Sequence, residues 1–154
     1  MRIAVVYYTR FGHSTVIAET VARELGAELR RIETPKQHSY PYMGVASTFN
    51  IRMKLAAMDS DFSAFDLVVL CTPIWAWKPA APARTFLREA KLPARLAVCF
   101  STGGGPTQRA QEKLRQDIAG RRVEVVAFGE ISTDKATDDA LREAARRFAG
   151  RLPK

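Results

Sequence analysis

Short apolar runs that alternate with amphipathic helical patterns constrain the fold of this chain more than any other feature of its sequence. The runs are brief, nearly continuous and rich in Val and aromatic residues, as is typical of parallel strands covered by helices on both faces. A more polar segment, residues 27–33, is predicted to form an edge strand. The apolar strands are predicted at Ile3–Tyr8, Leu67–Cys71, Leu96–Phe100 and Val123–Phe128.

Helical patterns occupy the stretches between these strands. One places Ile17 and Val21 on a common face and stops at Gly26, and another stops at Gly120. The last helix is predicted to begin near Asp138 and carries arginines toward its end, which matches the helix dipole. This order predicts an α/β fold with a doubly wound sheet of about five parallel strands, right-handed crossovers and three α/β/α layers.

The length and composition suit one compact domain over residues 1–154. The chain has 154 residues and 47% hydrophobic content, enough for a sizeable core. Its apolar runs are shorter than the about 18–20 residues of a membrane span, and Met1 leads straight into a strand without a cleavable signal pattern. We therefore expect a cytoplasmic protein without a transmembrane segment.

The least regular stretch follows the predicted edge strand. Prolines and a glycine break any long element within residues 34–46. After it, Ser47 is predicted to cap a short helix that turns three apolar side chains inward, those of Ile51, Leu55 and Met58.

Charge and cysteine content limit the partners and the redox chemistry. The net charge of +8 comes mostly from arginine. Scattered basic residues either form an ordinary solvated surface or attract anionic cofactors, acidic proteins or nucleic acid. Cys71 and Cys99 are too few for a disulfide framework and lie in apolar runs, where a thiol acts as a small hydrophobe. A redox dithiol is the alternative.

Three predicted strands end in segments suited to ligand binding. In open α/β sheets, ligands bind outside the carboxyl ends of the strands, where the strand order reverses. The first strand ends in "TRFGHST", which predicts a phosphate cradle at a helix N-terminus; a plain connection with Ser14 as N-cap is the alternative. The others end in "TPIWAWKP", with two tryptophans, and "STGGGP", whose glycines let backbone approach a flat ligand.

Several nucleotide folds are excluded by their missing signatures. The chain has no G-x-x-x-x-G-K-[ST] and no G-x-G-x-x-G after the first strand. A phospho-acceptor receiver domain needs acidic residues where Thr9 and Thr72 stand. What remains is a mononucleotide with one phosphate and an aromatic face. Neither a metal-ligand cluster nor an acid, base or nucleophile constellation stands out, as suits a protein whose cofactor carries the chemistry.

Over essentially its whole length the sequence resembles the flavodoxin-like family. The phosphate loop T-x-T-G-x-T of that family is matched by Thr9, Gly12 and Ser14, with Phe11 at the middle hydroxyl and His13 where asparagine is common. The segment "DLVVLCTPIWAWKPAAPARTFL" looks like the second flavin loop of small FMN-binding members, and "FSTGGG" like the third. The resemblance implies the strand order 2-1-3-4-5.

The resemblance also implies where FMN binds. The phosphate would lie on residues 9–14, and the isoalloxazine ring between loops 72–77 and 101–105, with Trp75 at the family's aromatic position. Arg84 belongs to the second segment, although a helix salt bridge explains it equally well. Tyr40 and Tyr42 either cover the flavin or anchor their own loop. The cofactor-binding residues predicted in this way are Thr9, Arg10, Phe11, Gly12, His13, Ser14, Thr72, Pro73, Ile74, Trp75, Ala76, Trp77, Ser101, Thr102, Gly103, Gly104 and Gly105.

One departure from the family bears on mechanism. Where flavodoxin-like carriers have Ala-Gly near flavin N5, this chain has Ala76-Trp77. The glycine permits a peptide flip that stabilises one-electron-reduced flavin, because the flipped turn needs a positive φ. A β-carbon makes that flip costly, so we expect two-electron chemistry.

Three functions stay open at this stage. The leading one is an FMN oxidoreductase, reduced by NAD(P)H or by a partner protein and acting on a small acceptor such as a quinone. The second is an electron shuttle; typical flavodoxin shuttles are acidic, whereas this chain is basic, so its partner would be acidic or its substrate anionic. The third is a binding module without activity. Nucleic acid is not an expected partner, and the protein is expected to be a monomer or homodimer.

Overall fold

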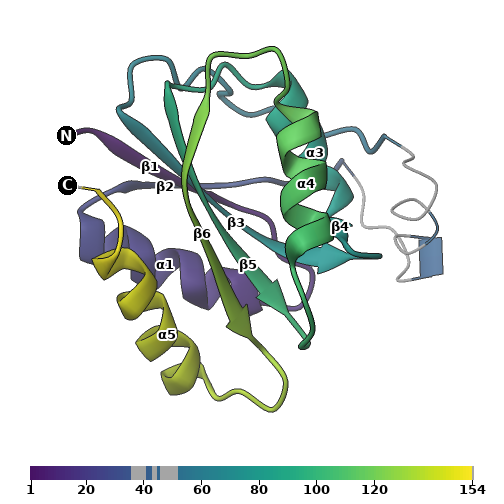
Figure 1. The fold of residues 1–154 in the computed structure, drawn as a ribbon, viewed down its shortest axis with the longest axis vertical. Helices are drawn as coiled ribbons and strands as arrows, with labels where there is room; N and C mark the ends of the chain where they lie inside the picture. The colour runs from purple at the N-terminus through teal and green to yellow at the C-terminus, as the bar shows by residue number, and fades with distance from the viewer. Residues whose placement is uncertain (36–40, 43–44, 46–51, 154) are drawn as a thin grey trace.

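A parallel sheet lies between two layers of helices (Figure 1) in the computed structural model, which describes residues 1–35, 41–42, 45 and 52–153. The sheet order is β2-β1-β3-β5-β6, and the short strand β4 pairs with β3 off this path. Because the parallel strands run 2-1-3-4-5 when β4 is set aside, the predicted doubly wound fold is confirmed. The elements are β1 Ile3–Tyr7, α1 His13–Leu25, β2 Glu28–Arg31, β3 Leu67–Trp75, β4 Lys78–Pro79, α3 Ala81–Glu89, β5 Arg95–Thr102, α4 Gln108–Asp117, β6 Glu124–Ser132 and α5 Asp138–Gly150.

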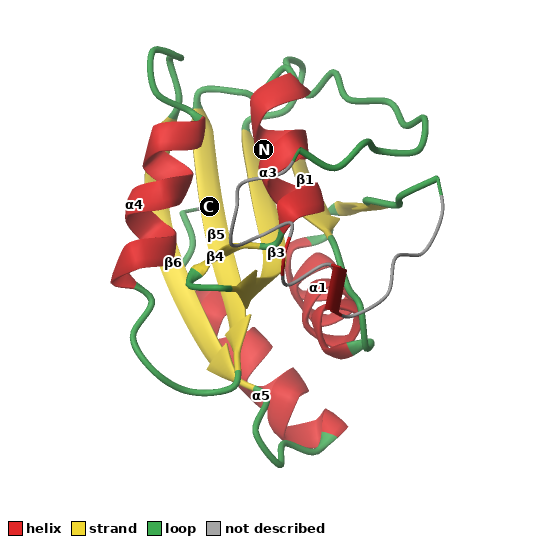
Figure 2. Ribbon diagram, turned by 90° about the vertical axis from the view of Figure 1, so that its right-hand side faces the viewer, coloured by secondary structure: helices red, strands yellow, loops and turns green. Residues whose placement is uncertain are grey.

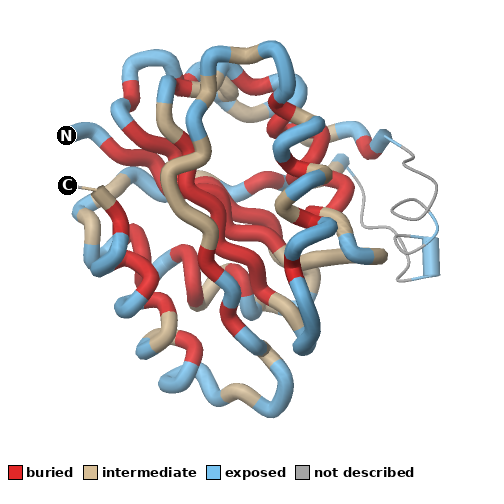
Figure 3. Tube along the Cα trace, in the orientation of Figure 1, coloured by how far each residue is buried: buried red, intermediate tan, exposed pale blue. Residues whose placement is uncertain are grey.

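Each central strand alternates between two hydrophobic cores. On β1, Ala4 and Val6 enter the core beneath α3 and α4, whereas Ile3 and Val5 enter the core beneath α1 and α5. Figures 1 and 2 show the two helix pairs on opposite faces of the sheet, and Figure 3 shows the strands buried between them. Burial on both faces explains why these strands read as continuous apolar runs.

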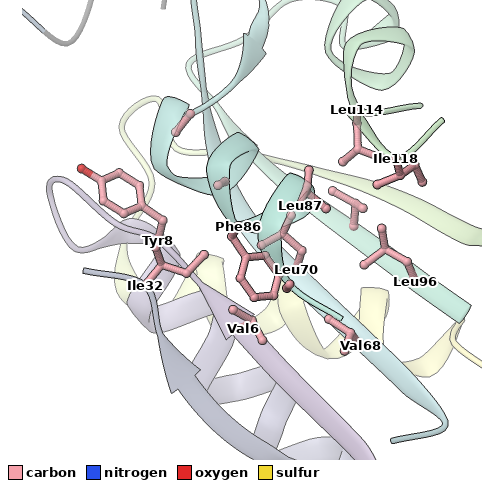
Figure 4. Close-up of a cluster of buried hydrophobic side chains, with 14 of the residues drawn as sticks. Val6, Tyr8, Ile32, Val68, Leu70, Phe86, Leu87, Leu96, Leu114 and Ile118 are labelled. Carbon is pink, nitrogen blue, oxygen red and sulfur yellow. The ribbon is translucent and has the colours of Figure 1, made fainter. Parts of the chain in front are cut away.

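The core beneath α3 and α4 reaches the edge of the sheet at Tyr8. Figure 4 shows Phe86 from α3 over Val6 of β1, with Tyr8 at the border of the cluster and its hydroxyl pointing away from it. An aromatic residue placed there joins the core to the strand end, where a ligand would bind.

Strand ends differ from the sequence prediction in a consistent direction. The strands β3, β5 and β6 each continue beyond their predicted apolar runs, ending at Trp75, Thr102 and Ser132. The edge strand is confirmed but is shorter than predicted, Glu28–Arg31, and pairs with β1. The carboxyl ends of three strands therefore lie several residues beyond the predicted apolar runs.

Helix boundaries follow the capping residues. Gly26 ends α1 in the left-handed region with φ of 60°, as predicted. The alternative of Ser14 as N-cap is wrong: Gly12 holds that position with φ of 97°, a conformation that glycine adopts without strain, and Ser14 lies buried in the first turn. Thr137 caps α5 by accepting a hydrogen bond from the Ala140 backbone N–H at 3.1 Å.

The segment before β3 is extended where the structure describes it. Ser47, Ile51 and Tyr40 lie outside the described residues, but residues 52–60 form no helix, so the predicted helix does not extend through Leu55 and Met58. Both side chains still pack against the core beneath α3 and α4. The physical reason is that the backbone of this segment bonds to distant elements: the Ala56 N–H donates to the Glu33 carbonyl at 2.7 Å, and the Met53 carbonyl accepts from Thr85 Oγ1 at 2.7 Å.

A buried ion network fastens α3 to α4. Arg84 donates to both carboxylate oxygens of Asp117, at 2.9 and 3.1 Å, and Arg88 donates to the same carboxylate at 2.9 Å. The side chains of Arg84 and Asp117 are 7% and 4% exposed. This geometry supports the salt-bridge interpretation of Arg84.

The cysteines face each other across neighbouring strands. Cys71 of β3 lies opposite Cys99 of β5 in the register, and both are buried beneath α1 and α5. Burial raises the pKa of both thiols, that of Cys99 to about 12. Protonated buried thiols act as small hydrophobes, which favours that interpretation over a redox dithiol.

Among the described residues, no helix combines the length and the hydrophobicity that a membrane span requires.

Candidate functional site

The carboxyl ends of β1, β3 and β5 converge on one cavity of about 230 Å³. These strands are neighbours in the sheet, so the loops that follow them meet at one edge. The lining residues come from the three predicted loops and from the end of β6: Thr9, Arg10, Phe11, His13, Ser14, Pro73, Ile74, Trp75, Ser101, Gly103 and Thr133.

The first turn of α1 offers backbone donors to this cavity. The first N–H groups of any α-helix lack intrahelical acceptors, and α1 has neither a side-chain cap nor an acidic residue in its first turn. One further donor is already used, because the Gly12 N–H donates to Thr9 Oγ1 at 2.8 Å and holds the loop in shape. The positive end of the helix dipole thus meets the cavity with no carboxylate of that turn to neutralise it.

Two loops are joined by a hydroxyl pair. Ser14 Oγ and Ser101 Oγ lie 3.0 Å apart and are buried, which ties the first turn of α1 to the end of β5. The glycine-rich loop then turns back on itself, because Thr102 Oγ1 accepts from the Gly104 N–H at 3.2 Å. A Cβ added at Gly103, Gly104 or Gly105 would meet no described atom within 4 Å, so this backbone borders open space.

The second loop is a tight β-hairpin, which the sequence did not predict. Trp75 pairs with Lys78 across the antiparallel β3 and β4, which leaves Ala76 and Trp77 as a two-residue turn. Both turn residues have positive φ, 49° and 62°, as a type I′ turn requires. The sequence prediction is that a β-carbon makes the peptide flip costly, because the flipped turn needs a positive φ. The hairpin already holds Ala76 and Trp77 at positive φ without glycine, so the cost of the flip stays a prediction that needs another physical reason.

The two tryptophans lie in different surroundings. Trp75 is partly buried and packs edge-on against Tyr8, with ring centroids 5.4 Å apart and an interplanar angle of 85°. Burial raises the pKa of Tyr8 to about 12 against the opposing influence of Arg10 and Arg31, so its hydroxyl stays protonated. Trp77 is 59% exposed at the hairpin tip.

A second cavity of about 220 Å³ adjoins the first one. Ile74 and Gly103 line both cavities, so the two cavities lie side by side between the start of α1 and the hairpin tip. Its walls come from the hairpin and the glycine-rich loop: Ile74, Ala76, Trp77, Thr102, Gly103, Gly104, Gly105 and Pro106.

The structure brings nearly all predicted site residues to these two cavities. The exceptions are Gly12, which shapes the loop backbone, and Thr72, which is buried and donates to the Pro73 carbonyl at 3.0 Å. Phe11 lines the first cavity yet is 67% exposed. Sequence reasoning missed Thr133, whose signal is its position directly after the polar end of β6.

Comparisons with known proteins identify the fold. No family model and no curated protein matches the chain. Among solved structures, a flavoprotein from Lactobacillus acidophilus in complex with FMN is 17% identical, with a TM-score of 0.69 over 84% of this chain and 92% of its own. A flavodoxin, WrbA-like protein from Agrobacterium tumefaciens is 17% identical, with a TM-score of 0.61 over 97% and 93% of the two chains. Flavodoxin 2 from Bacillus cereus is 17% identical, with a TM-score of 0.56 over 97% and 95%.

The chain has the flavodoxin-like fold. In this flavodoxin-like chain the two cavities lie at the switch point of the sheet, where β1 and β3 lead to opposite helical layers. The residues at that point can hold an anion at the start of α1 and a flat aromatic group beside the tryptophans, and both groups fit one ligand that spans the cavities.

Proposed function

We propose that this protein binds FMN in the two adjoining cavities and works as a redox flavoprotein. The observation that carries the proposal is the pair of neighbouring cavities between a helix start without a side-chain cap and an aromatic hairpin. One end suits a single terminal phosphate, and the other suits a flat ring. The flavoprotein from Lactobacillus acidophilus, whose structure contains FMN, supports this choice among mononucleotides.

The roles of the individual residues follow from their positions. Backbone N–H groups of the first α1 turn and the hydroxyl of Ser14 would hold the phosphate, with Arg10 and His13 at the cavity wall. Trp75 would stack on or border the ring, and N–H groups of the 103–105 loop would donate to its polar edge. Bound FMN supplies the transfer of electrons and hydride, while the protein supplies orientation and a partly dry pocket.

Within that class we propose an oxidoreductase reduced by NAD(P)H or by a partner protein, with a small acceptor such as a quinone. The whole chain would act as one cytoplasmic domain. The hairpin supports two-electron chemistry for a reason other than the one expected from sequence. Flipping the peptide between Ala76 and Trp77 would convert type I′ into type II′, whose first central position is suited to glycine, so Ala76 opposes the flip.

A visible spectrum of the purified protein tests the proposal. We expect flavin absorbance that is retained on gel filtration, and FMN affinity at least about 100-fold above that of riboflavin, because charge-assisted hydrogen bonds to phosphate contribute about 1.5–3 kcal/mol each. Equal affinity for the two flavins would contradict the phosphate cradle. Anaerobic addition of NADPH then distinguishes an NADPH-reduced enzyme, which bleaches, from a shuttle that waits for a protein donor.

A further inference from the structure

A cluster of basic side chains borders the tip of the hairpin, next to the cavity proposed for the flavin ring. We define the basic rim as Trp77, Lys78, Arg109 and Lys113, which line a groove of about 180 Å³ together with Glu112 and Gln116. The hairpin strand β4 packs against α4, so the two elements that carry the rim are held together (Figure 2). Trp77 lines both this groove and the second cavity, so the rim begins where a bound ring would end.

The electrostatics of the groove favour an anionic partner. Three cations and one carboxylate line the groove, and burial together with the charges of Arg84, Lys113 and Arg109 lowers the pKa of Lys78. Crowded like charges raise the energy of the site until an anion neutralises them. Glu112 is the acidic residue among the lining residues, so the groove as a whole stays positive.

The shape of the rim favours a protein over a small molecule. Trp77 projects from the hairpin tip, 59% exposed, and the Arg109 guanidinium lies 5.3 Å from its ring centroid. Tryptophan and arginine are the residues that most often dominate binding energy in protein interfaces. Arg109 and Lys113 lie on one face of α4, where single carboxylates on a facing protein surface can pair with them.

We propose that the basic rim is the docking surface for an acidic redox protein that exchanges electrons with FMN; this inference rests on the proposed function. Docking there brings the redox centre of the partner toward the edge of the flavin ring. A one-electron donor must dock twice: each encounter oxidises one reduced centre, the two electrons reach FMN, and water supplies the protons.

The probe for this surface is a plant-type [2Fe–2S] ferredoxin with an acidic surface and a low potential. Reduced ferredoxin is mixed with FMN-loaded protein under anaerobic conditions, and the rate of flavin bleaching is followed by stopped flow. We expect the rate to fall about tenfold or more between low and high salt, because attraction between opposite charges steers the encounter. Arg109→Glu and Lys113→Glu should each slow it several-fold at low salt, and Glu112→Lys should accelerate it.

Two controls separate docking from other effects. Arg122→Glu changes the same charge at an exposed residue before β6, at the opposite end of the sheet, and should leave the rate unchanged. Calorimetric binding of oxidised ferredoxin to FMN-free protein gives a readout that needs no electron transfer, and the rim variants should weaken it in the same order.

The possible results assign the rim unambiguously. A bleaching rate and a ferredoxin affinity that change neither with salt nor in the rim variants would overturn the docking proposal. A loss of reduction by NADPH that exceeds the loss with ferredoxin would instead assign the rim to a dinucleotide, which also overturns it. If the protein fails to bind FMN, the proposed function fails, and the calorimetric binding still decides the rim by itself.

Discussion

Ser14 and Ser101 form a hydrogen bond of 3.0 Å between the first turn of α1 and the end of β5, 87 residues apart in the chain. Both residues are buried beneath the first cavity. The hydroxyl pair therefore connects two segments that are far apart in the sequence and that both line the first cavity. We therefore expect an anion bound at the start of α1 to order the glycine-rich loop as well, because the two loops share this bond.

Gly12→Val should impair FMN binding through the phosphate. Gly12 has φ of 97°, and a valine forced into that region costs about 1–2 kcal/mol and disturbs the backbone of the loop that would hold the phosphate. We expect FMN affinity to fall at least about tenfold while riboflavin affinity changes little. Gly120→Val is the matched control, since Gly120 also has positive φ, 81°, and borders open space away from the site. Flavin fluorescence titration measures both; equal losses for FMN and riboflavin would contradict the phosphate position.

Trp75→Ala should weaken FMN binding and remove much of the quenching of tryptophan fluorescence on titration. The indole lines the first cavity, and an aromatic contact contributes about 0.5–1.5 kcal/mol beyond buried area. Stability should fall as well, because Trp75 packs against Tyr8, so Trp75→Phe serves as the control that keeps the packing. Unchanged affinity in both Trp75→Ala and Trp77→Ala would mean that the ring binds elsewhere.

Ala76→Gly should stabilise the hairpin and change the redox behaviour. Removing a β-carbon at φ of 49° should raise the free energy of unfolding by about 1 kcal/mol, measured in urea. Stepwise anaerobic reduction should then show more long-wavelength absorbance from one-electron-reduced flavin, because glycine at the first central position permits the type II′ turn. Trp77→Gly, with φ of 62° in the parent, relieves similar strain but leaves Ala76 in place, and should show less of this absorbance.

Asp117→Asn should destabilise the protein strongly while leaving the phosphate cradle intact. It leaves the buried Arg84 guanidinium without its carboxylate, and breaking a buried pair in this way costs about 3–5 kcal/mol. Urea unfolding measures the loss. The double variant Arg84→Met/Asp117→Leu should recover part of it, because it removes both buried charges. A loss no larger for the single variant than for the double one would contradict this account.

Tyr8 should make stability depend on pH at the alkaline end. Its pKa is about 12 in the folded protein against 10.0 for the ordinary side chain, so between these values the unfolded chain loses the proton first. Stability should therefore fall as the pH rises from 10 toward 12. Urea unfolding at several pH values should show a shallower decline in Tyr8→Phe, and an identical decline would show that Tyr8 titrates normally.

The sheet could be predicted because burial on two faces leaves a strong sequence signal. Val5 and Val6 are both apolar although they enter opposite cores, and Gly26 marks a helix end through its backbone freedom. The hairpin could not be predicted, because Ala76 and Trp77 have no local preference for positive φ and take it from their pairing in the fold.

The site was predictable in outline for the same reason. Three loops follow recognisable strands, and parallel strands bring their carboxyl ends together. Thr133 was not predicted because β6 continues to Ser132, beyond the apolar run that predicted its end at Phe128. The absence of helix over residues 52–60 also left no local sign, since it depends on hydrogen bonds to Glu33 and Thr85.

Successive residues of β1, β3 and β5 enter opposite cores, so the backbone of the sheet screens each helix pair from substitutions beneath the other. A substitution in one core can therefore be compensated by a second substitution in the same core, without a change in the other core. The loops that carry the glycines and the tryptophans follow β5 and β3, beyond the residues of these strands that alternate between the two cores. Substitutions in these loops can thus change what the strand ends bind while the sheet is kept, which accords with a fold shared at 17% identity.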